Sequence, residues 1–238
     1  MSHYTLDYPK EFKKSAKPYL IPQYLLLCGG PSNASDRVLK SISSQNLNPM
    51  CSANFKIMDE VKMMLKHLFQ TTNPLTLAIQ TSGNGGNEAI ILNLLSPGDK
   101  ILIPIKGIWG DTLVDMASRH GLEIFTVRKE PGEVFTVDEL ETAITAHRPK
   151  LLFLVHGESS VGVVQKLEGI GAMCHKHDCL FAVDGVSSST VRGPLGDRCC
   201  FGCFSKSCRS HNWALHALFQ PQSTGTNLRQ KATTSLLL

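Results

Sequence analysis

The sequence predicts an α/β fold in which a mostly parallel β-sheet is covered by helices on both faces. Between about residues 75 and 188, short apolar runs alternate with segments whose apolar residues recur at helical spacing, and this alternation is typical of β–α–β units. The 238 residues are enough for one large domain, and contents of 42% hydrophobic and 18% charged residues are ordinary for a globular protein.

The expected elements follow one another closely along the chain. A long helix is expected at 55–71, where FKIMDEVKMMLKHLFQT carries apolar residues at helical spacing. Strands are expected at 74–80, 100–105, 122–127, 149–157 and 179–185. Helices are expected between these strands, at 87–95, 111–121, 136–147 and 169–178. Thr136 and Glu139 have the spacing of a capping box, which predicts the start of the third of these helices.

Three groups of polar or glycine-rich residues follow expected strands. They are TSGNGG at 81–86, HGESS at 156–160, and Asp184 after LFAV. In open parallel sheets the ligand lies beyond the carboxyl ends of the strands. The sequence therefore predicts that these groups line one ligand-binding crevice.

Two features of this crevice favour a phosphorylated aromatic ligand. TSGNGG exposes backbone N–H groups where a helix starts, which favours a phosphate, although a simple strand-to-helix turn explains the glycines as well. Trp109, between Gly107 and Gly110, offers a flat face for an aromatic ring. The alternative for Trp109 is a packing role.

Asp184 ends an apolar strand, so its carboxylate is expected to be buried and to need a partner. Beside a phosphate loop and a stacking ring, a protonated pyridine nitrogen suits it, and a helix cap is the alternative. The HGESS segment lacks the G-x-S-x-G pattern of serine hydrolases. Its polar groups are therefore expected to contact a ligand rather than act as nucleophiles, although His156 and Glu158 also suit structural roles.

Charge and hydropathy argue against nucleic-acid and membrane partners. The net charge is +4, and five basic residues against one acidic residue from Asp197 onward account for all of it. The remainder is balanced, which gives a nucleic-acid partner no support. No apolar run approaches the roughly 18 residues of a membrane span, and the N-terminal residues lack the apolar core of a secretory signal. The scattered cysteines outside the tail favour a reducing compartment.

A family resemblance rests on segments spread from about residue 15 to 188. They are LLCGGPSN, IMDEVK, LFQTTNPLTLAI, TSGNGGNEA, GIWGD, PKLLFLVHGESSVGV and HKHDCLFAVDGVSS. Together they resemble the alanine–glyoxylate (serine–pyruvate) aminotransferases, class V pyridoxal-phosphate enzymes related to 3-hydroxykynurenine transaminase. The resemblance implies the large domain of a fold-type I pyridoxal-phosphate transferase, with the small C-terminal domain absent.

The resemblance also implies a set of residues that bind pyridoxal 5′-phosphate. Ser82, Gly83 and Asn84 match the loop on the phosphate side of the cofactor. Trp109 matches the tryptophan that stacks on the ring, and Ser159 matches a hydroxyl contact to the cofactor. Asp184 matches the aspartate that holds the pyridinium N–H. No metal ligand is implied.

The activity implied is transfer of an amino group from alanine or serine to glyoxylate or pyruvate. The family works as a homodimer, and the expected partners are a small amino acid and an oxo acid. A peroxisomal location is implied as well, although the chain ends in LLL and carries no C-terminal peroxisomal signal. A cytosolic or mitochondrial location is the alternative.

The sequence changes character near residue 190, so three regions are expected. They are an N-terminal arm (1–22), a partial cofactor-binding domain (23–190) and a tail (191–238). The family pattern next requires a strand, a Ser-Gln-Lys segment whose lysine forms a Schiff base, and later a substrate-binding arginine. None of these can be identified in the sequence after residue 190. A shifted reading frame from Phe201 permits Ser-Gln-Lys, so the tail is interpreted as out-of-frame and poorly ordered.

The tail has two further possible interpretations, a zinc site and a Schiff-base role for Lys206. Cys200, Cys203, Cys208 and His211 include a C-x-x-C pair, but they lack the second knuckle of a zinc site. Lys206 follows a serine, but its spacing from Asp184 is a few residues shorter than the family's. The rival hypothesis for function is a catalytically inactive fragment that lacks both the Schiff-base lysine and the substrate arginine.

Overall fold

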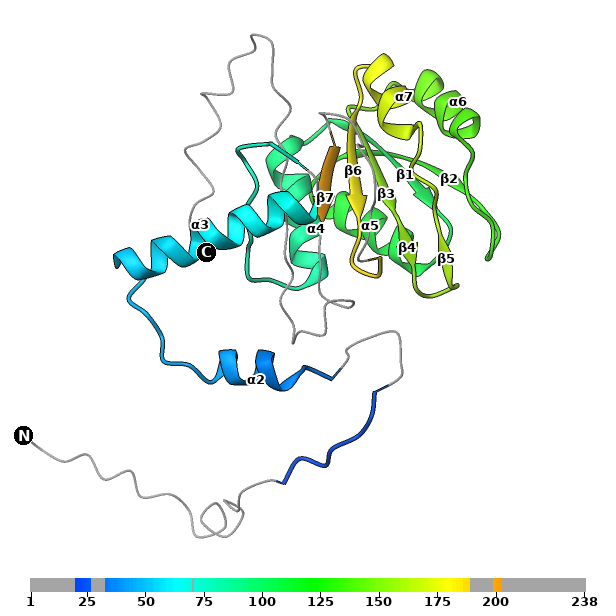
Figure 1. Ribbon diagram of the computed structural model, residues 1–238. Helices are drawn as coiled ribbons and strands as arrows, with labels where there is room; N and C mark the ends of the chain where they lie inside the picture. Colours follow the sequence, from blue (N-terminus) through cyan, green and yellow to red (C-terminus); the bar gives the residue numbers. More distant parts are fainter. Residues whose placement is uncertain (1–19, 27–32, 70, 189–198, 203–238) are drawn as a thin grey trace, which may run out of the picture.

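The computed structural model describes residues 20–26, 33–69, 71–188 and 199–202 (Figure 1). Its main sheet has five parallel strands in the spatial order β2-β1-β3-β6-β7. They span Lys100–Ile105 (β1), Glu123–Arg128 (β2), Leu151–Val155 (β3), Leu180–Asp184 (β6) and Cys199–Gly202 (β7). Two short strands, Gly157–Glu158 (β4) and Val163–Val164 (β5), form an antiparallel pair after β3.

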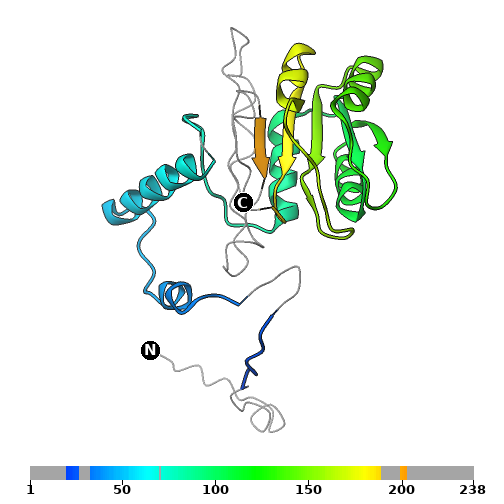
Figure 2. The same cartoon turned by 45° about the vertical axis from the view of Figure 1, so that its right-hand side comes forward.

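Four helices cover the two faces of this sheet. They span Gly83–Leu94 (α4), Ile108–Arg119 (α5), Val137–His147 (α6) and Ile170–Lys176 (α7). The connection through α5 runs from β1 to β2, whereas those through α6 and α7 run across the sheet in the opposite direction. Because such connections are right-handed, the two directions place helices on opposite faces. In agreement, α4 contacts α5 and α6 contacts α7 (Figures 1 and 2), which confirms the predicted fold class.

The core lies on both sides of the central strands. Every residue of β3 is buried, and so are all but the first residues of β1 and β6. Such continuous apolar strands are typical of a parallel sheet covered on both faces. In β2, by contrast, every residue is partly or fully exposed, because this strand lies at the edge of the sheet. The carboxyl ends of β1, β3 and β6 are thereby held in a rigid framework.

The strand expected at 74–80 is absent, which corrects the prediction. Residues 71–80 form no strand or helix. Thr76 is fully buried, and its Oγ1 donates a hydrogen bond of 2.8 Å to the Asn73 carbonyl. An apolar run becomes a strand only when another strand supplies hydrogen-bond partners, and no strand among the described residues pairs with this one. The following helix also begins earlier than expected, at Gly83.

The strand β7 falls within the region expected to be a poorly ordered tail. It pairs in parallel with β6, from Phe181 opposite Cys199 to Asp184 opposite Gly202. The sequence interpretation found no strand there, so this part of it was wrong. The open edge of β6 provides backbone partners that a local pattern does not reveal. The rest of the tail lies outside the described residues.

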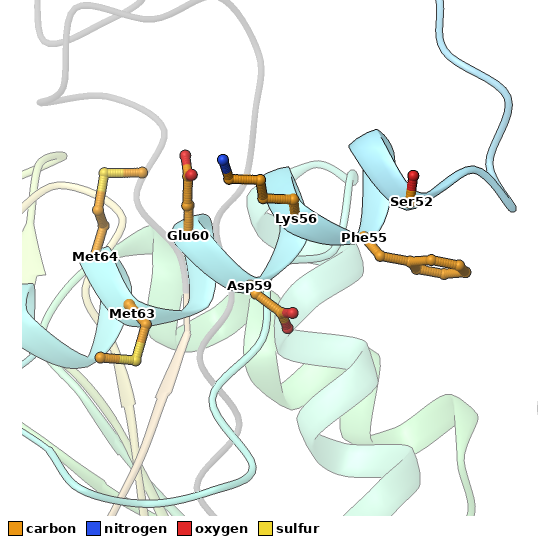
Figure 3. Close-up of a pocket in the computed structure, with 7 residues that line it drawn as sticks. All are labelled: Ser52, Phe55, Lys56, Asp59, Glu60, Met63 and Met64. Atoms are coloured by element: carbon orange, nitrogen blue, oxygen red, sulfur yellow. The ribbon is translucent and has the colours of Figure 1, made fainter.

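The N-terminal described region contains two helices, Asp36–Ile42 (α2) and Ser52–Leu68 (α3). The long helix predicted at 55–71 is therefore confirmed, although only Leu65 of α3 is buried. Figure 3 shows two rows of side chains along α3, with Phe55, Asp59 and Met63 on one side. These rows line a shallow hollow.

Within the described part of the chain, no helix is long and apolar enough to cross a membrane.

Candidate cofactor pocket

A small pocket opens at the carboxyl ends of β1, β3 and β6. Its volume is about 150 Å³. Its lining residues come from the starts of α4 and α5 and from the ends of β3 and β6 with the segments that follow them; they are Ser82, Gly83, Asn84, Trp109, Val155, Gly157, Asp184, Val186 and Ser187. The predicted crevice is therefore present. A cavity of about this volume accommodates a benzene ring in another protein, so the pocket suits a small aromatic ligand.

The first turn of α4 forms one wall. Ser82 is the N-cap, and its Oγ accepts a hydrogen bond of 3.2 Å from the Gly85 N–H. Gly83 and Asn84 begin the helix and line the pocket. A Cβ atom at Gly85 would lie 2.0 Å from the Thr81 Oγ1, so the close approach of Thr81 requires glycine at this position. The wall thus offers a helix N-terminus, where backbone N–H groups favour an anion.

The start of α5 and the segment that begins with β4 form the second wall and are joined by several contacts. The indole Nε1–H of Trp109 donates to the Ser159 Oγ at 2.9 Å, and the Ile108 N–H donates to the Ser160 Oγ at 3.2 Å. A Cβ atom at Gly107 would lie 2.5 Å from the side chain of Glu158, so glycine permits this approach. Ser159 does not line the pocket itself. It contacts the ring that does.

Asp184 lies at the end of β6 and is 6% exposed. Its Oδ2 accepts a hydrogen bond from the Asn87 amide at 2.9 Å, and its Oδ1 accepts one from the Val186 N–H at 2.9 Å. The expectation that Asp184 would be buried is confirmed.

A buried lysine near the pocket was missed by the sequence interpretation. Lys106 follows β1, is 3% exposed, and its ammonium donates a hydrogen bond to the Val155 carbonyl. Burial lowers the pKa of Lys106 to about 8, against the opposing influence of the Glu158 and Asp184 carboxylates. The only sequence signal was a lysine directly after an apolar strand, where a surface position is the usual expectation.

His156 also lies beneath this edge of the sheet. Its Nδ1 is 2.6 Å from the Ser188 Oγ, and its backbone N–H donates to the Asp184 carbonyl. Burial and then the positive charge of Lys106 lower the pKa of His156, whereas Glu168 raises it. His156 is therefore neutral near pH 7. It stabilises the loop after β6 and does not line the pocket.

The structure brings all six predicted site residues together. Five of them line the pocket, and the sixth, Ser159, accepts a hydrogen bond from one of the five, Trp109. A phosphorylated pyridine fits this set of groups, because a helix N-terminus, an indole face and a buried carboxylate match its phosphate, ring and ring N–H.

The zinc and Lys206 alternatives concern residues of the tail. Cys203, Lys206, Cys208 and His211 lie outside the described residues, and only the backbone of Cys200 is described. Among the described residues, no group of three or more His, Cys, Asp or Glu side chains could hold a metal ion.

The fold and the pocket define a parallel α/β ligand-binding domain whose site lies at the carboxyl ends of the strands. Comparison with known proteins narrows this class. The family model described as aminotransferase class V matches residues 30–194. The chain therefore belongs to the class V aminotransferases, a family of enzymes that use pyridoxal 5′-phosphate.

Named relatives agree with this assignment. An alanine–glyoxylate aminotransferase of Rattus norvegicus is 45% identical over 187 residues, which make up 79% of this chain and 45% of the relative. One from Drosophila melanogaster is 40% identical over 173 residues, with shares of 72% and 44%. The solved structure of an alanine–glyoxylate aminotransferase from Nostoc sp. has a TM-score of 0.83 and 35% identity, and the match covers 90% of this chain and 58% of that one. The chain spans about half the length of these relatives.

Proposed function

We propose that the pocket binds pyridoxal 5′-phosphate and that the protein of which this domain is part transfers amino groups between a small amino acid and an oxo acid. The observation that carries the proposal is the meeting, in one pocket, of the α4 N-terminus, Trp109 and the buried carboxylate of Asp184. The relatives named for alanine and glyoxylate support those two compounds as substrates. Serine and pyruvate are the alternatives.

Each wall has a separate role in this proposal. The backbone N–H groups around Ser82, Gly83 and Asn84 bind the phosphate, and Ser159 orients the indole of Trp109 against the ring. Asp184 holds the proton of the ring nitrogen, assisted by Asn87, which fixes the carboxylate. When bound, pyridoxal 5′-phosphate supplies the electron sink that accepts the electron pair left by the departing α-proton of an amino acid.

The binding role is tested by titrating the full chain with pyridoxine 5′-phosphate, which lacks the reactive aldehyde. Quenching of Trp109 fluorescence reports binding in a Trp213→Phe background, because the chain has two tryptophans. We expect Asp184→Asn to weaken binding roughly 10-fold to 100-fold, the size of a lost charged hydrogen bond. Asp115→Asn, which alters an exposed carboxylate paired with Arg119, is the control and should leave affinity unchanged. Equal affinity in all three chains would contradict the proposal.

A second candidate is that this chain binds the cofactor but does not turn over. The observation that favours it is the absence, among the described residues, of a lysine that lines the pocket. Transamination of alanine and glyoxylate by the purified chain decides between the candidates. Turnover would establish that an amine of this chain serves the reaction. Cofactor binding without turnover would establish that the chain holds the cofactor but lacks the groups that catalyse the reaction.

The proposed assembly is a homodimer. The support from this chain is the exposed apolar surface of α3, which includes Phe55, Met58 and Met63. A peroxisomal location is proposed only by family resemblance, with the cytosol or mitochondria as alternatives. Sedimentation of the chain and imaging of the tagged full-length protein test these two points.

A further inference from the structure

The helix α5, which carries Trp109 into the pocket wall, begins without a local side-chain cap. Its N-cap residue is Gly107, which has no side chain to accept a hydrogen bond from the first N–H groups of the helix. A side chain at this position could not supply one, because a Cβ atom there would lie 2.5 Å from the Cδ and Cγ atoms of Glu158. Trp109 is the second residue of α5. The contacts that hold this end of the helix therefore also affect where the indole lies.

Ser160, in the turn between β4 and β5, supplies an acceptor to this helix end. Its Oγ accepts a hydrogen bond of 3.2 Å from the Ile108 N–H, the first of α5, and donates its own proton to the Oε1 of Glu158. The backbone N–H of Ser160 donates to the same Oε1 at 3.2 Å. Glu158 is only 1% exposed. The buried carboxylate therefore fixes the position of Ser160 and the direction of its hydroxyl, and leaves the hydroxyl oxygen to accept from α5.

The hairpin that carries Glu158 and Ser160 is held independently of α5. β4 pairs with β5, and the Gly162 N–H donates to the Glu158 carbonyl across the turn at 2.9 Å. Directly after β5, the side chain of Gln165 is fully buried and exchanges two hydrogen bonds with the backbone of Phe135. A cap carried by this hairpin is therefore anchored to another part of the domain.

We propose that Glu158 and Ser160 form a tertiary cap for α5 and are positioning residues that hold Trp109 at the wall of the pocket. Neighbouring hydroxyls of one turn then hold two parts of the same segment, because Ser159 bonds the indole of Trp109 and Ser160 bonds the backbone before it. The carboxylate also lies against the N-terminal end of α5, where the helix dipole favours negative charge. The effect on ligand binding rests on the proposed function, whereas the cap itself does not.

The cap is tested in the ligand-free full chain by the time-resolved fluorescence anisotropy of Trp109, in a Trp213→Phe background. Ser160→Ala removes the capping hydroxyl, and Ser160→Thr restores one. Ser118→Ala is the matched control, because it removes an exposed hydroxyl that donates to the Asp115 carbonyl in the last turn of the same helix. The affinity of each chain for pyridoxine 5′-phosphate is then measured by calorimetry.

We expect Ser160→Ala to increase the amplitude of the fast anisotropy decay, which reports motion of the indole. We also expect it to weaken binding of pyridoxine 5′-phosphate roughly 2-fold to 10-fold, the range for one lost neutral hydrogen bond. Ser160→Thr should recover most of both losses, and Ser118→Ala should match the native chain.

Glu158 has a separate test, because its carboxylate is proposed to act through Ser160. Glu158→Met should increase the indole motion in the native chain, but much less in a chain that already carries Ser160→Ala. Since Ser160→Ala leaves the carboxylate in place, the effect of that variant cannot come from the electrostatic interaction of Glu158 with Lys106. Equal effects of Glu158→Met in the two backgrounds would exclude action through Ser160. If Glu158→Met does not fold, the Ser160 variants decide.

Two results would overturn the proposal as a whole. One is an unchanged anisotropy decay in Ser160→Ala, and the other is an equal change in Ser118→Ala. A changed decay with unchanged affinity would overturn the positioning role for the ligand and leave only a structural cap. If no chain binds the probe, the native chain included, the proposed function fails, and the anisotropy alone decides on the cap.

Discussion

Lys106 shows at the scale of one residue how a cost in stability can accompany a site. The pKa of Lys106 is about 8 in the folded chain, whereas that of an ordinary exposed lysine is 10.5. A lysine with a lowered pKa destabilises the folded state when it is charged, and the destabilisation disappears as pH rises above the unfolded pKa. Stability should therefore increase between pH 8 and 10.5 relative to a chain without this amine.

Urea unfolding of native and Lys106→Met chains measures this effect. We predict that the free energy of unfolding of the native chain, relative to the variant, rises by up to about 3 kcal/mol between pH 8 and 10.5. Below pH 8 the difference should be constant. Lys176→Met should show no such pH dependence. A flat difference across the whole range would mean that Lys106 titrates like an exposed lysine.

Trp109 provides a second residue-scale prediction, since it has both a ring and a hydrogen bond to Ser159. Trp109→Phe keeps an aromatic face but loses this bond, and we expect affinity for pyridoxine 5′-phosphate to fall roughly 2-fold to 10-fold. Ser159→Ala removes the same hydrogen bond and keeps the indole, so it isolates the orienting contribution. Calorimetry is the appropriate measurement, because the first variant removes the fluorophore. Unchanged affinity in both would exclude Trp109 from the ligand's surroundings.

The limits of sequence prediction are clear at the residue scale. Ser82, Trp109 and Asp184 could be selected because each lies at or just after an apolar run expected to be a strand, and parallel strands end at the same edge of the sheet. Lys106 occupies the same kind of position but was missed, because a lysine after a strand usually lies at the surface. Its buried ammonium bonds to the carbonyl of Val155 and interacts electrostatically with Glu158 and Asp184, all distant in the sequence, and no local pattern reveals this.

At the scale of elements, the start of α6 was predicted most closely. Thr136 and Glu139 form both bonds of the capping box, and Glu139 also accepts from Lys129 at 2.6 Å. We predict that Thr136→Ala lowers the free energy of unfolding by about 1 kcal/mol, measured by urea denaturation. Thr142→Ala in the same helix is the control, because it removes a threonine without removing a cap. Equal losses in the two variants would show that the cap contributes nothing specific.

The start of α4 offers a prediction that connects helix geometry with the pocket. In Gly85→Ala, the new Cβ would lie 2.0 Å from the Thr81 Oγ1, so the first turn must move and we expect affinity for pyridoxine 5′-phosphate to fall. Thr81→Ala removes that oxygen, after which the nearest Thr81 atom lies 3.3 Å away. The double variant should therefore recover most of the lost affinity. No recovery would indicate that glycine is needed for another reason.

Elements with a clear apolar spacing or with their own hydrogen bonds were predicted better than strands whose hydrogen-bond partners lie far away in the sequence. The strand at 100–105 has its predicted bounds, and α3 was recognised from its apolar spacing. The run at 74–80 was wrongly assigned as a strand, and β7 was missed. In both cases the presence of a partner strand decides the outcome, and pairing in a sheet is not a local property.

At the scale of the whole molecule, the exposed surface of α3 is the most distinctive feature. Phe55, Met58, Met63 and Met64 are each at least 45% exposed, and Figure 3 shows three of them, Phe55, Met63 and Met64, along the helix. Neighbouring apolar groups of this size on a surface favour association. We predict that the chain associates as its concentration rises in sedimentation velocity, and that Phe55→Ser with Met63→Gln reduces this association. Lys56→Gln on the same helix is the control. A chain that remains monomeric throughout would contradict this prediction.

The central claim is that Asp184 holds a protonated ring nitrogen in the pocket beside the start of α4. Nitrogen NMR of pyridoxine 5′-phosphate labelled at the ring nitrogen, bound to the full chain, tests it most directly. We predict the chemical shift of a protonated pyridine in the native complex and loss of that signal in Asp184→Asn. An unprotonated nitrogen in the native complex, or the same protonated signal in both chains, would contradict the account.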